Sequence, residues 1–220
     1  MRVTTAIALA FTLCLAFAQT VNADDTNTES GTQNLDQQIA TCLLLGNQEE
    51  IALAQFAEKH AEHEQVKAFA KTLVAAHTKA VAIIQKAAPE IADLQLVSAN
   101  AVSPSADRSQ PVGHAENATA TALMQQVKSE CLSLTEKELG QYQGAEFDHA
   151  FIGQQLGAHV GMLAQLHGSN SFASPDLQKV IAEGEKMTTA HMAEAKKIMV
   201  QLKAAPKTAS ATQRATSQSR

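Results

Sequence analysis

Apolar residues recur every three or four positions over most of the chain, with polar residues between them. This spacing places the apolar side chains on one face of an α-helix. It predicts helices over about residues 35–61, 65–88, 118–138, 146–167 and 174–202. Each of these helices is apolar on one side only, so it must pack against partners. The pattern predicts an all-α fold, an up-and-down bundle of four long helices with an additional short helix.

Two polar residues interrupt the apolar face of the stretch 146–167. Asp148 and His159 are eleven residues apart, a spacing that places both near the centre of that face. The face otherwise consists of Phe151, Ile152, Leu156, Met162, Leu163 and Leu166. A helix does not usually direct a carboxylate and an imidazole into a core without partners. The stretch therefore indicates a buried polar site.

Other predicted helices carry polar residues in similar places. His77 and His191 each lie in the middle of the apolar face of their helix. In the first predicted helix, Glu49 and Glu50 flank the apolar face on opposite sides, so either one could point inward. The apolar face of the third helix includes Leu123, Met124, Val127, Cys131 and Leu134.

A long connection separates the second predicted helix from the third. Residues 89–117 are weakly patterned and contain Pro104, Pro111 and Gly113, while Pro89 limits continuation of the preceding helix. Long loops are uncommon in compact domains, and some helical bundles use one as a crossover. We therefore expect the helices on either side of this long crossover to run parallel.

The N-terminal segment has the pattern of an export signal. Arg2 precedes an apolar run from Ala6 to Ala18, and small residues ending at Ala18 and Ala23 suit cleavage by signal peptidase. The run is short for a membrane span, although a retained N-terminal anchor is the alternative. We expect residues 1–23 to be a signal peptide and the protein to be exported, to the periplasm if the host is Gram-negative.

The remaining chain divides by composition. Residues 24–34 are polar and predict a flexible leader, and residues 204–220 are rich in Ser, Thr, Ala and Gln and predict a disordered tail. Residues 35–203 then form the helical bundle domain, in which no segment could cross a bilayer.

Charge and motifs limit the function classes. The net charge of −5 argues against nucleic-acid binding, which needs a basic face. The chain has no Gly-rich phosphate loop, no Gly-x-Ser-x-Gly elbow and no Cys-x-x-Cys. Its one Glu-x-x-His, from Glu146 to His149, is a poor match to a di-iron bundle because Glu146 projects about 160° from the centre of the apolar face. The sequence therefore assigns no catalytic residue and does not favour an enzyme.

Two cysteines, Cys42 and Cys131, remain if Cys14 is removed with the signal peptide. Both lie on apolar faces of predicted helices. An exported protein permits a disulfide between them. The alternative is that they are two small buried residues.

Several short motifs resemble a known family. They are Glu50-Ile51, the run from Val66 to His77-Thr78, the run from Phe147-Asp148 to His159, and His191. Spread over about residues 35–202, these motifs are similar to those of the bacterial "domain of unknown function 4142" family. The resemblance implies an exported, ferritin-like helical bundle without an established activity. The polar family positions that it implies here are Glu50, His77, Asp148, His159 and His191.

The chain also departs from the family pattern. The family often has Asp before the histidine of the second helix, where this chain has Ala76, and it often has Tyr where this chain has Phe151. The missing Asp removes a ligand or an acceptor, and so weakens any metal chemistry that the resemblance implies.

The five polar family positions are the candidate metal site, because imidazole and carboxylate ligands suit Fe, Zn or Cu. Counted from the turn near Glu62, Glu50 and His77 differ in depth by only about 4 Å. Counted from the connection after Gly168, His159 and His191 differ by about 12 Å, or by about 6 Å if the helix is longer. A site formed by residues of three helices, or two separate pairs of residues, is therefore as compatible with the sequence as one site to which all four helices contribute.

Two functions remain open. In one, the protein is an exported bundle that binds a transition-metal ion, Fe, Zn or Cu, through inward His, Asp and Glu side chains. In the other, it is a metal-free interaction or stress-protective envelope protein. Its histidines are then neutral core residues, hydrogen-bonded to a facing Asp, Glu or Gln155, and fix the helix register. Convergence of at least three of the named side chains would favour the first function.

Overall fold

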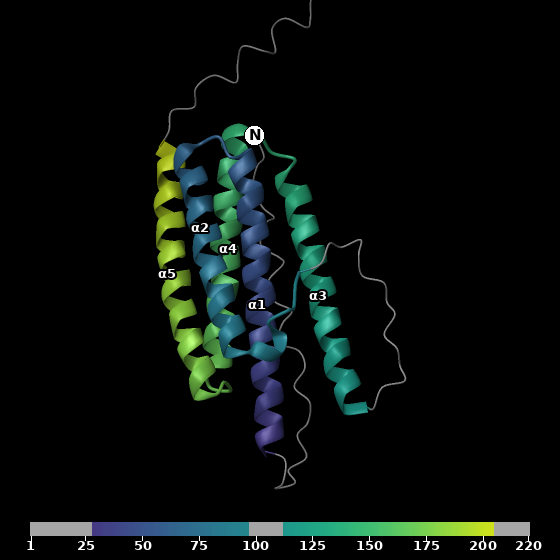
Figure 1. The fold of residues 1–220 in the computed structure, drawn as a ribbon. Helices are drawn as coiled ribbons and strands as arrows, with labels where there is room; N and C mark the ends of the chain where they lie inside the picture. The colour runs from purple at the N-terminus through teal and green to yellow at the C-terminus, as the bar shows by residue number, and fades with distance from the viewer. Residues whose placement is uncertain (1–27, 97–111, 205–220) are drawn as a thin grey trace, which may run out of the picture.

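The computed structural model describes residues 28–96 and 112–204, and these residues are helical with short connections. The helices follow in the order α1 (Thr28–His60), α2 (Glu64–Ala87), the short 3-10 helix η1 (Pro89–Ile91), α3 (Val112–Leu139), α4 (Gly144–Asn170) and α5 (Pro175–Ala204) (Figure 1). The all-α prediction is confirmed. None of the described helices combines the length and the apolar character that a membrane span requires.

Two helices begin earlier than the sequence pattern predicts. α1 begins at Thr28 and so includes residues 28–34, which we predicted as part of a leader. α3 begins at Val112, within the predicted connection. The predicted signal peptide and the predicted tail after Ala204 lie outside the described residues.

Four helices surround a common core. α1 with α2 and α4 with α5 form two antiparallel hairpins, and the hairpins pack together through α2 on α5 and α1 on α4. α3 lies outside this group and packs mainly against α1 (Figure 1). The structure therefore differs from the prediction of four long helices with a short one: five long helices are described, and the added helix is long.

α3 runs parallel to α1. The thiol of Cys42 donates to Met124 Sδ at 3.5 Å, and further along both helices Lys128 Nζ lies 2.8 Å from Glu49 Oε2. Since α1 and α2 are antiparallel, α3 is also antiparallel to α2. The prediction that the helices on either side of the long connection run parallel is wrong.

The described start of the connection runs along α1. After η1 the Gln48 side chain of α1 donates to the carbonyl oxygen of Leu94, so the chain turns back along α1. On α3, part of the apolar face predicted to point inward is exposed instead. The exposed residues are Leu123, Val127 and Leu134.

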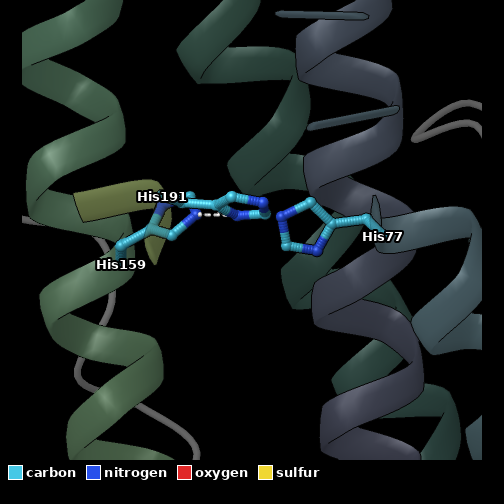
Figure 2. Close-up of side chains that lie close together, drawn as sticks. All are labelled: His77, His159 and His191. Atoms are coloured by element: carbon cyan, nitrogen blue, oxygen red, sulfur yellow. Dashed lines mark hydrogen bonds between the residues drawn. The ribbon is translucent and has the colours of Figure 1, made fainter. Parts of the chain in front are cut away.

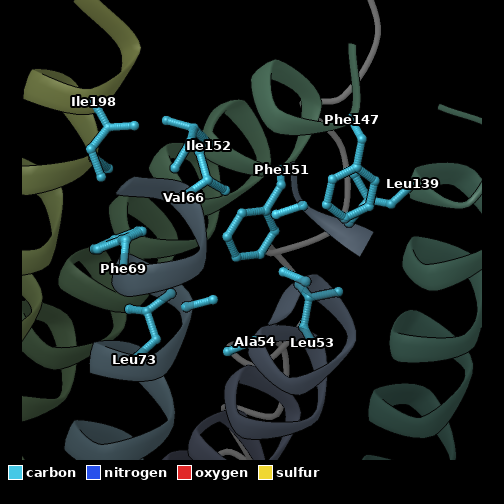
Figure 3. Close-up of a cluster of buried hydrophobic side chains, with 14 of the residues drawn as sticks. Leu53, Ala54, Val66, Phe69, Leu73, Leu139, Phe147, Phe151, Ile152 and Ile198 are labelled. Atoms are coloured by element: carbon cyan, nitrogen blue, oxygen red, sulfur yellow. The ribbon is translucent and has the colours of Figure 1, made fainter. Parts of the chain in front are cut away.

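Two hydrophobic clusters make up the core. The first lies near the α1–α2 turn and includes Leu53, Phe69, Leu73, Phe147 and Phe151 (Figure 3). The second lies near the α4–α5 turn and includes Leu44, Ile84, Met162, Leu166 and Ile181. The helix segments between the two clusters carry several of the buried polar residues, including three histidines.

Phe151→Ala tests the first cluster. Phe151 is fully buried, and its ring centroid lies 6.3 Å from that of Phe147. Removing the ring leaves a cavity, so we expect a loss of about 3–5 kcal/mol in the free energy of unfolding, measured by urea denaturation. Phe172→Ala is the control, because Phe172 is 60% exposed and should cost about 0.5 kcal/mol or less. Equal losses in the two variants would contradict the assignment of the core.

Candidate metal centre

A layer of buried polar side chains separates the two hydrophobic clusters. Each of the four core helices contributes to this layer. Its members are Asn47 and Glu50 of α1, His77 of α2, Gln155 and His159 of α4, and Thr188 and His191 of α5. Because buried polar groups are costly unless they find partners, such a layer identifies a candidate site.

Three histidines from three helices converge in this layer (Figure 2). One ring nitrogen from each of His77, His159 and His191 lies within 4.8 Å of the other two. Within residues 28–96 and 112–204, this is the group of His, Cys, Asp and Glu side chains that could hold a metal ion. The structure thus brings together three of the five residues singled out in the sequence.

The predicted difference in depth between His159 and His191 is wrong. The two rings are hydrogen-bonded, with His159 Nε2 3.1 Å from His191 Nδ1. One helical turn away, the Thr188 hydroxyl donates to Met162 Sδ at 3.3 Å, so the helices are in register here. α4 continues to Asn170, beyond its predicted end, and this added length together with the turn that follows removes the expected offset.

Hydrogen bonds fix the orientation of His77 and His159. The Asn47 amide nitrogen donates to the Leu43 carbonyl at 2.7 Å, so the Asn47 oxygen is left to accept from His77 Nδ1, also at 2.7 Å. His159 Nδ1 donates to the Gln155 carbonyl at 2.9 Å. In both neutral rings the proton is therefore on Nδ1, and the lone pair is on Nε2.

The two Nε2 lone pairs have different surroundings. His77 Nε2 is buried without a hydrogen-bond partner. His159 Nε2 accepts from His191 Nδ1, which must then carry its own proton. Transfer of the His191 proton to its other ring nitrogen would leave three unprotonated nitrogens facing one another. His77 and His159 already donate their other N–H to an amide or carbonyl oxygen, as metal-binding histidines commonly do.

Burial keeps all three rings neutral. Desolvation lowers the pKa of His159 and of His191 to about 4, with the neighbouring His159 ring adding to the effect on His191. It lowers the pKa of His77 well below the usual value, and the other two rings add to this shift. A metal ion needs the neutral ring, so the three histidines are in the ligand form at neutral pH.

Glu50 lies in the same layer but does not join the three converging nitrogens. Its side chain is 1% exposed, and neither carboxylate oxygen has a hydrogen-bond partner. Burial raises the pKa of Glu50 to about 7, against smaller opposing effects from Gln155 and Lys128. Of the two glutamates that flank the apolar face of α1, Glu50 faces the core, whereas Glu49 pairs with Lys128 of α3.

Asp148 lies elsewhere. Its two carboxylate oxygens accept from the backbone N–H groups of Glu62 and His63, at 3.1 and 2.9 Å. These residues immediately precede α2, where a negative charge is favourable. Asp148 is eleven residues from His159 on the same helix, or about 16 Å. The structure therefore does not bring Asp148 to the histidines; it joins α4 to the α1–α2 turn.

Sequence reasoning missed Asn47 and Thr188. Asn47 holds the His77 ring, and Thr188 donates to Met162 beside His159. The signal for Asn47 was present, because it follows Leu43 by four residues and so lies on the same face of the first helix. A neutral polar side chain is, however, a weaker sign of a buried site than a charged one.

Among the described residues, no disulfide joins Cys42 and Cys131, so the predicted alternative of a disulfide is not realised. Cys42 is buried and contacts Met124 of α3. Cys131 is half-buried beside Glu49, which lies seven residues from Cys42 on α1. Seven residues of helix span about 10 Å, too far for a disulfide between the two positions.

Comparison with known proteins gives one match. The family model described as Domain of unknown function (DUF4142) matches residues 18–198, about four-fifths of the chain. No curated protein and no solved structure matches the chain.

Asp148→Ala tests the structural role of Asp148. Two N–H groups of the α1–α2 turn lose a charged acceptor, so the free energy of unfolding should fall by about 2–3 kcal/mol in chemical denaturation. Asp176→Ala is the control, since Asp176 is exposed and its ion pair with Lys179 is screened by solvent; this substitution should change stability much less. A stability of Asp148→Ala equal to that of the unsubstituted protein would refute the role.

Glu50→Gln tests the buried carboxyl through pH. The pKa of Glu50 is about 7 in the folded protein, against an ordinary value of 4.5, so folding binds a proton at pH values between the two. Glu50 therefore contributes less and less stability as the pH rises from 4.5 to 7. In the metal-free protein, the stability of Glu50→Gln relative to the unsubstituted protein should rise by about 2–3 kcal/mol over this window.

Exposed Glu183 provides the matched control. Lys186 lowers the pKa of Glu183, so Glu183→Gln should not gain relative stability as the pH rises. Parallel pH curves for Glu50→Gln and the unsubstituted protein would show that Glu50 is not held protonated by burial.

Proposed function

We propose that this chain, which belongs to the domain of unknown function 4142 family, binds one transition-metal ion between His77, His159 and His191. The observation that carries the proposal is the convergence of three buried ring nitrogens within 4.8 Å. Imidazole ligands suit Fe, Zn or Cu. We assign no chemical reaction to this site, and the proposed function is the binding of the metal ion.

The chemistry of the layer supports a metal ion. An unpartnered buried nitrogen such as His77 Nε2 costs about 1–3 kcal/mol, and coordination would remove this cost. The Nδ1 atoms of His77 and His159 already donate to oxygen acceptors, so their rings are oriented before an ion arrives. Three protein ligands leave room for a further ligand, as in other sites with three histidines.

Glu50 provides the negative charge that a buried cation requires. Its carboxyl group belongs to the same layer, and both of its oxygens lack hydrogen-bond partners. An ion at the histidines favours the ionised carboxylate, since opposite charges attract strongly in a medium of low dielectric constant. We therefore keep Glu50 in the proposed site as the carboxylate and leave out Asp148.

We further propose that the protein is exported from the cytoplasm. The positive start and apolar run of the first 18 residues support export, and cleavage would follow Ala18 or Ala23. We also propose that the four core helices are a ferritin-like bundle, with α3 as an addition. The two antiparallel hairpins and the polar site between them support this description.

A metal-free role is the second candidate, and the hydrogen bonds favour it. His77 pairs with Asn47, and His159 pairs with the Gln155 carbonyl and with His191. Such pairs satisfy most of the ring nitrogens without an ion and fix the register of the helices. The protein would then be an interaction or stress-protective protein of the cell envelope.

Titration with Co²⁺ and Zn²⁺ separates the two candidates. The protein should bind one ion per chain, with a visible Co²⁺ absorption band that Zn²⁺ abolishes, and its melting temperature should rise with the ion. His159→Ala should lower the affinity by about 100-fold or more, because it removes a ligand. His167→Ala is the control on the same helix, since its side chain is 65% exposed.

Two results would favour the metal-free role instead. One is that neither ion binds to the unsubstituted protein. The other is that His159→Ala and His167→Ala bind both ions with the same affinity.

A further inference from the structure

A cavity beside the histidine layer is not accounted for by metal binding. It has a volume of about 260 Å³ and lies between α2 and α5, with its floor on α1 and α4. The cavity is partly open to solvent, and its volume is larger than that of the enclosed engineered cavities of about 150 Å³ that bind benzene. None of the three histidines lines it, and the cavity is thus separate from the proposed metal site.

Small residues on the facing helices create the space. Ala76 and Ala80 of α2 and Gly184 of α5 line the cavity where larger side chains would fill it. Gly184 also lets α5 lie close to Leu166, another lining residue, because an added Cβ would lie 3.2 Å from Leu166 Cδ2. Small residues therefore bound the cavity on both facing helices.

The lining determines the chemistry of the occupant. The floor carries the apolar side chains of Leu43 and Met162, and the polar atoms of Asn47 are already engaged by His77 and by the Leu43 carbonyl. At the exposed edge, Lys79 and Glu183 carry opposite charges and offset each other. We propose that this cavity binds a small, uncharged, mainly apolar molecule of one or two rings.

The occupant would also touch the histidine layer. It lies against Asn47, whose oxygen accepts the proton of His77 Nδ1. Binding should therefore change the environment of the His77 ring without replacing any ligand of the proposed metal site. The proposal does not depend on a metal ion, and it is tested on metal-free protein so that the failure of one proposal leaves the other standing.

Titration with N-phenyl-1-naphthylamine, an uncharged two-ring fluorescent probe, tests the proposal. One probe should bind per folded chain, with an increase in fluorescence. Ala80→Leu should weaken binding by about tenfold or more, because the larger side chain occupies the cavity. Ala82→Leu is the matched control, since Ala82 is exposed on the same helix and does not line the cavity. Circular dichroism checks that both variants fold, and Ala76→Val replaces Ala80→Leu if that variant does not.

Two further measurements test the class of ligand and its position. The sulfonated analogue 8-anilino-1-naphthalenesulfonate should bind more weakly, because the cavity offers no net positive charge. In NMR spectra of the imidazole rings, the uncharged probe should shift the signals of His77 and leave those of exposed His167 unchanged. Absence of probe binding, equal binding by Ala80→Leu and Ala82→Leu, equal binding of the anion, or an unchanged His77 signal would overturn the proposal.

Discussion

The arrangement of this protein depends on burying polar side chains between two hydrophobic clusters. Each cluster alone can be built from leucine, isoleucine and phenylalanine, but the layer between them must satisfy every donor and acceptor it contains. The contacts of His77 with Asn47, and of His159 with the Gln155 carbonyl, meet part of this demand. The carboxylate oxygens of Glu50, one nitrogen of His77 and the side-chain oxygen of Gln155 remain without hydrogen-bond partners, so the layer lowers stability unless something else binds there.

The sequence was sufficient to predict that the side chains of the three histidines point into the core. His77, His159 and His191 each lie at the centre of an apolar face, and helical periodicity is enough to show that such residues point inward. The all-α class follows from the same periodicity. The sequence pattern of a helix predicts the direction of each side chain around the helix axis well, because each residue adds about 100° of rotation whatever the tertiary structure is.

Helical periodicity could not predict the height of each site residue along its helix, or which neighbouring helix each face packs against. Asp148 shares a face with His159, yet it lies three turns away and contacts a different part of the molecule. The depth of His191 relative to His159 depended on the length of a connection that the pattern left uncertain. The place of α3 was missed because an apolar face shows that a helix packs, but not against which neighbour. Its parallel course beside α1 depends on contacts such as Lys128 with Glu49.

The division of the site between the two hairpins has a consequence for folding. His77 belongs to the α1–α2 hairpin, whereas His159 and His191 belong to the α4–α5 hairpin, and 82 positions separate His77 from His159 in the sequence. Each hairpin can form from local contacts, but the three rings meet only after the hairpins dock. A ligand shared by all three rings thus acts as a late cross-link between two halves of the chain. It would slow their separation more than it would speed their assembly.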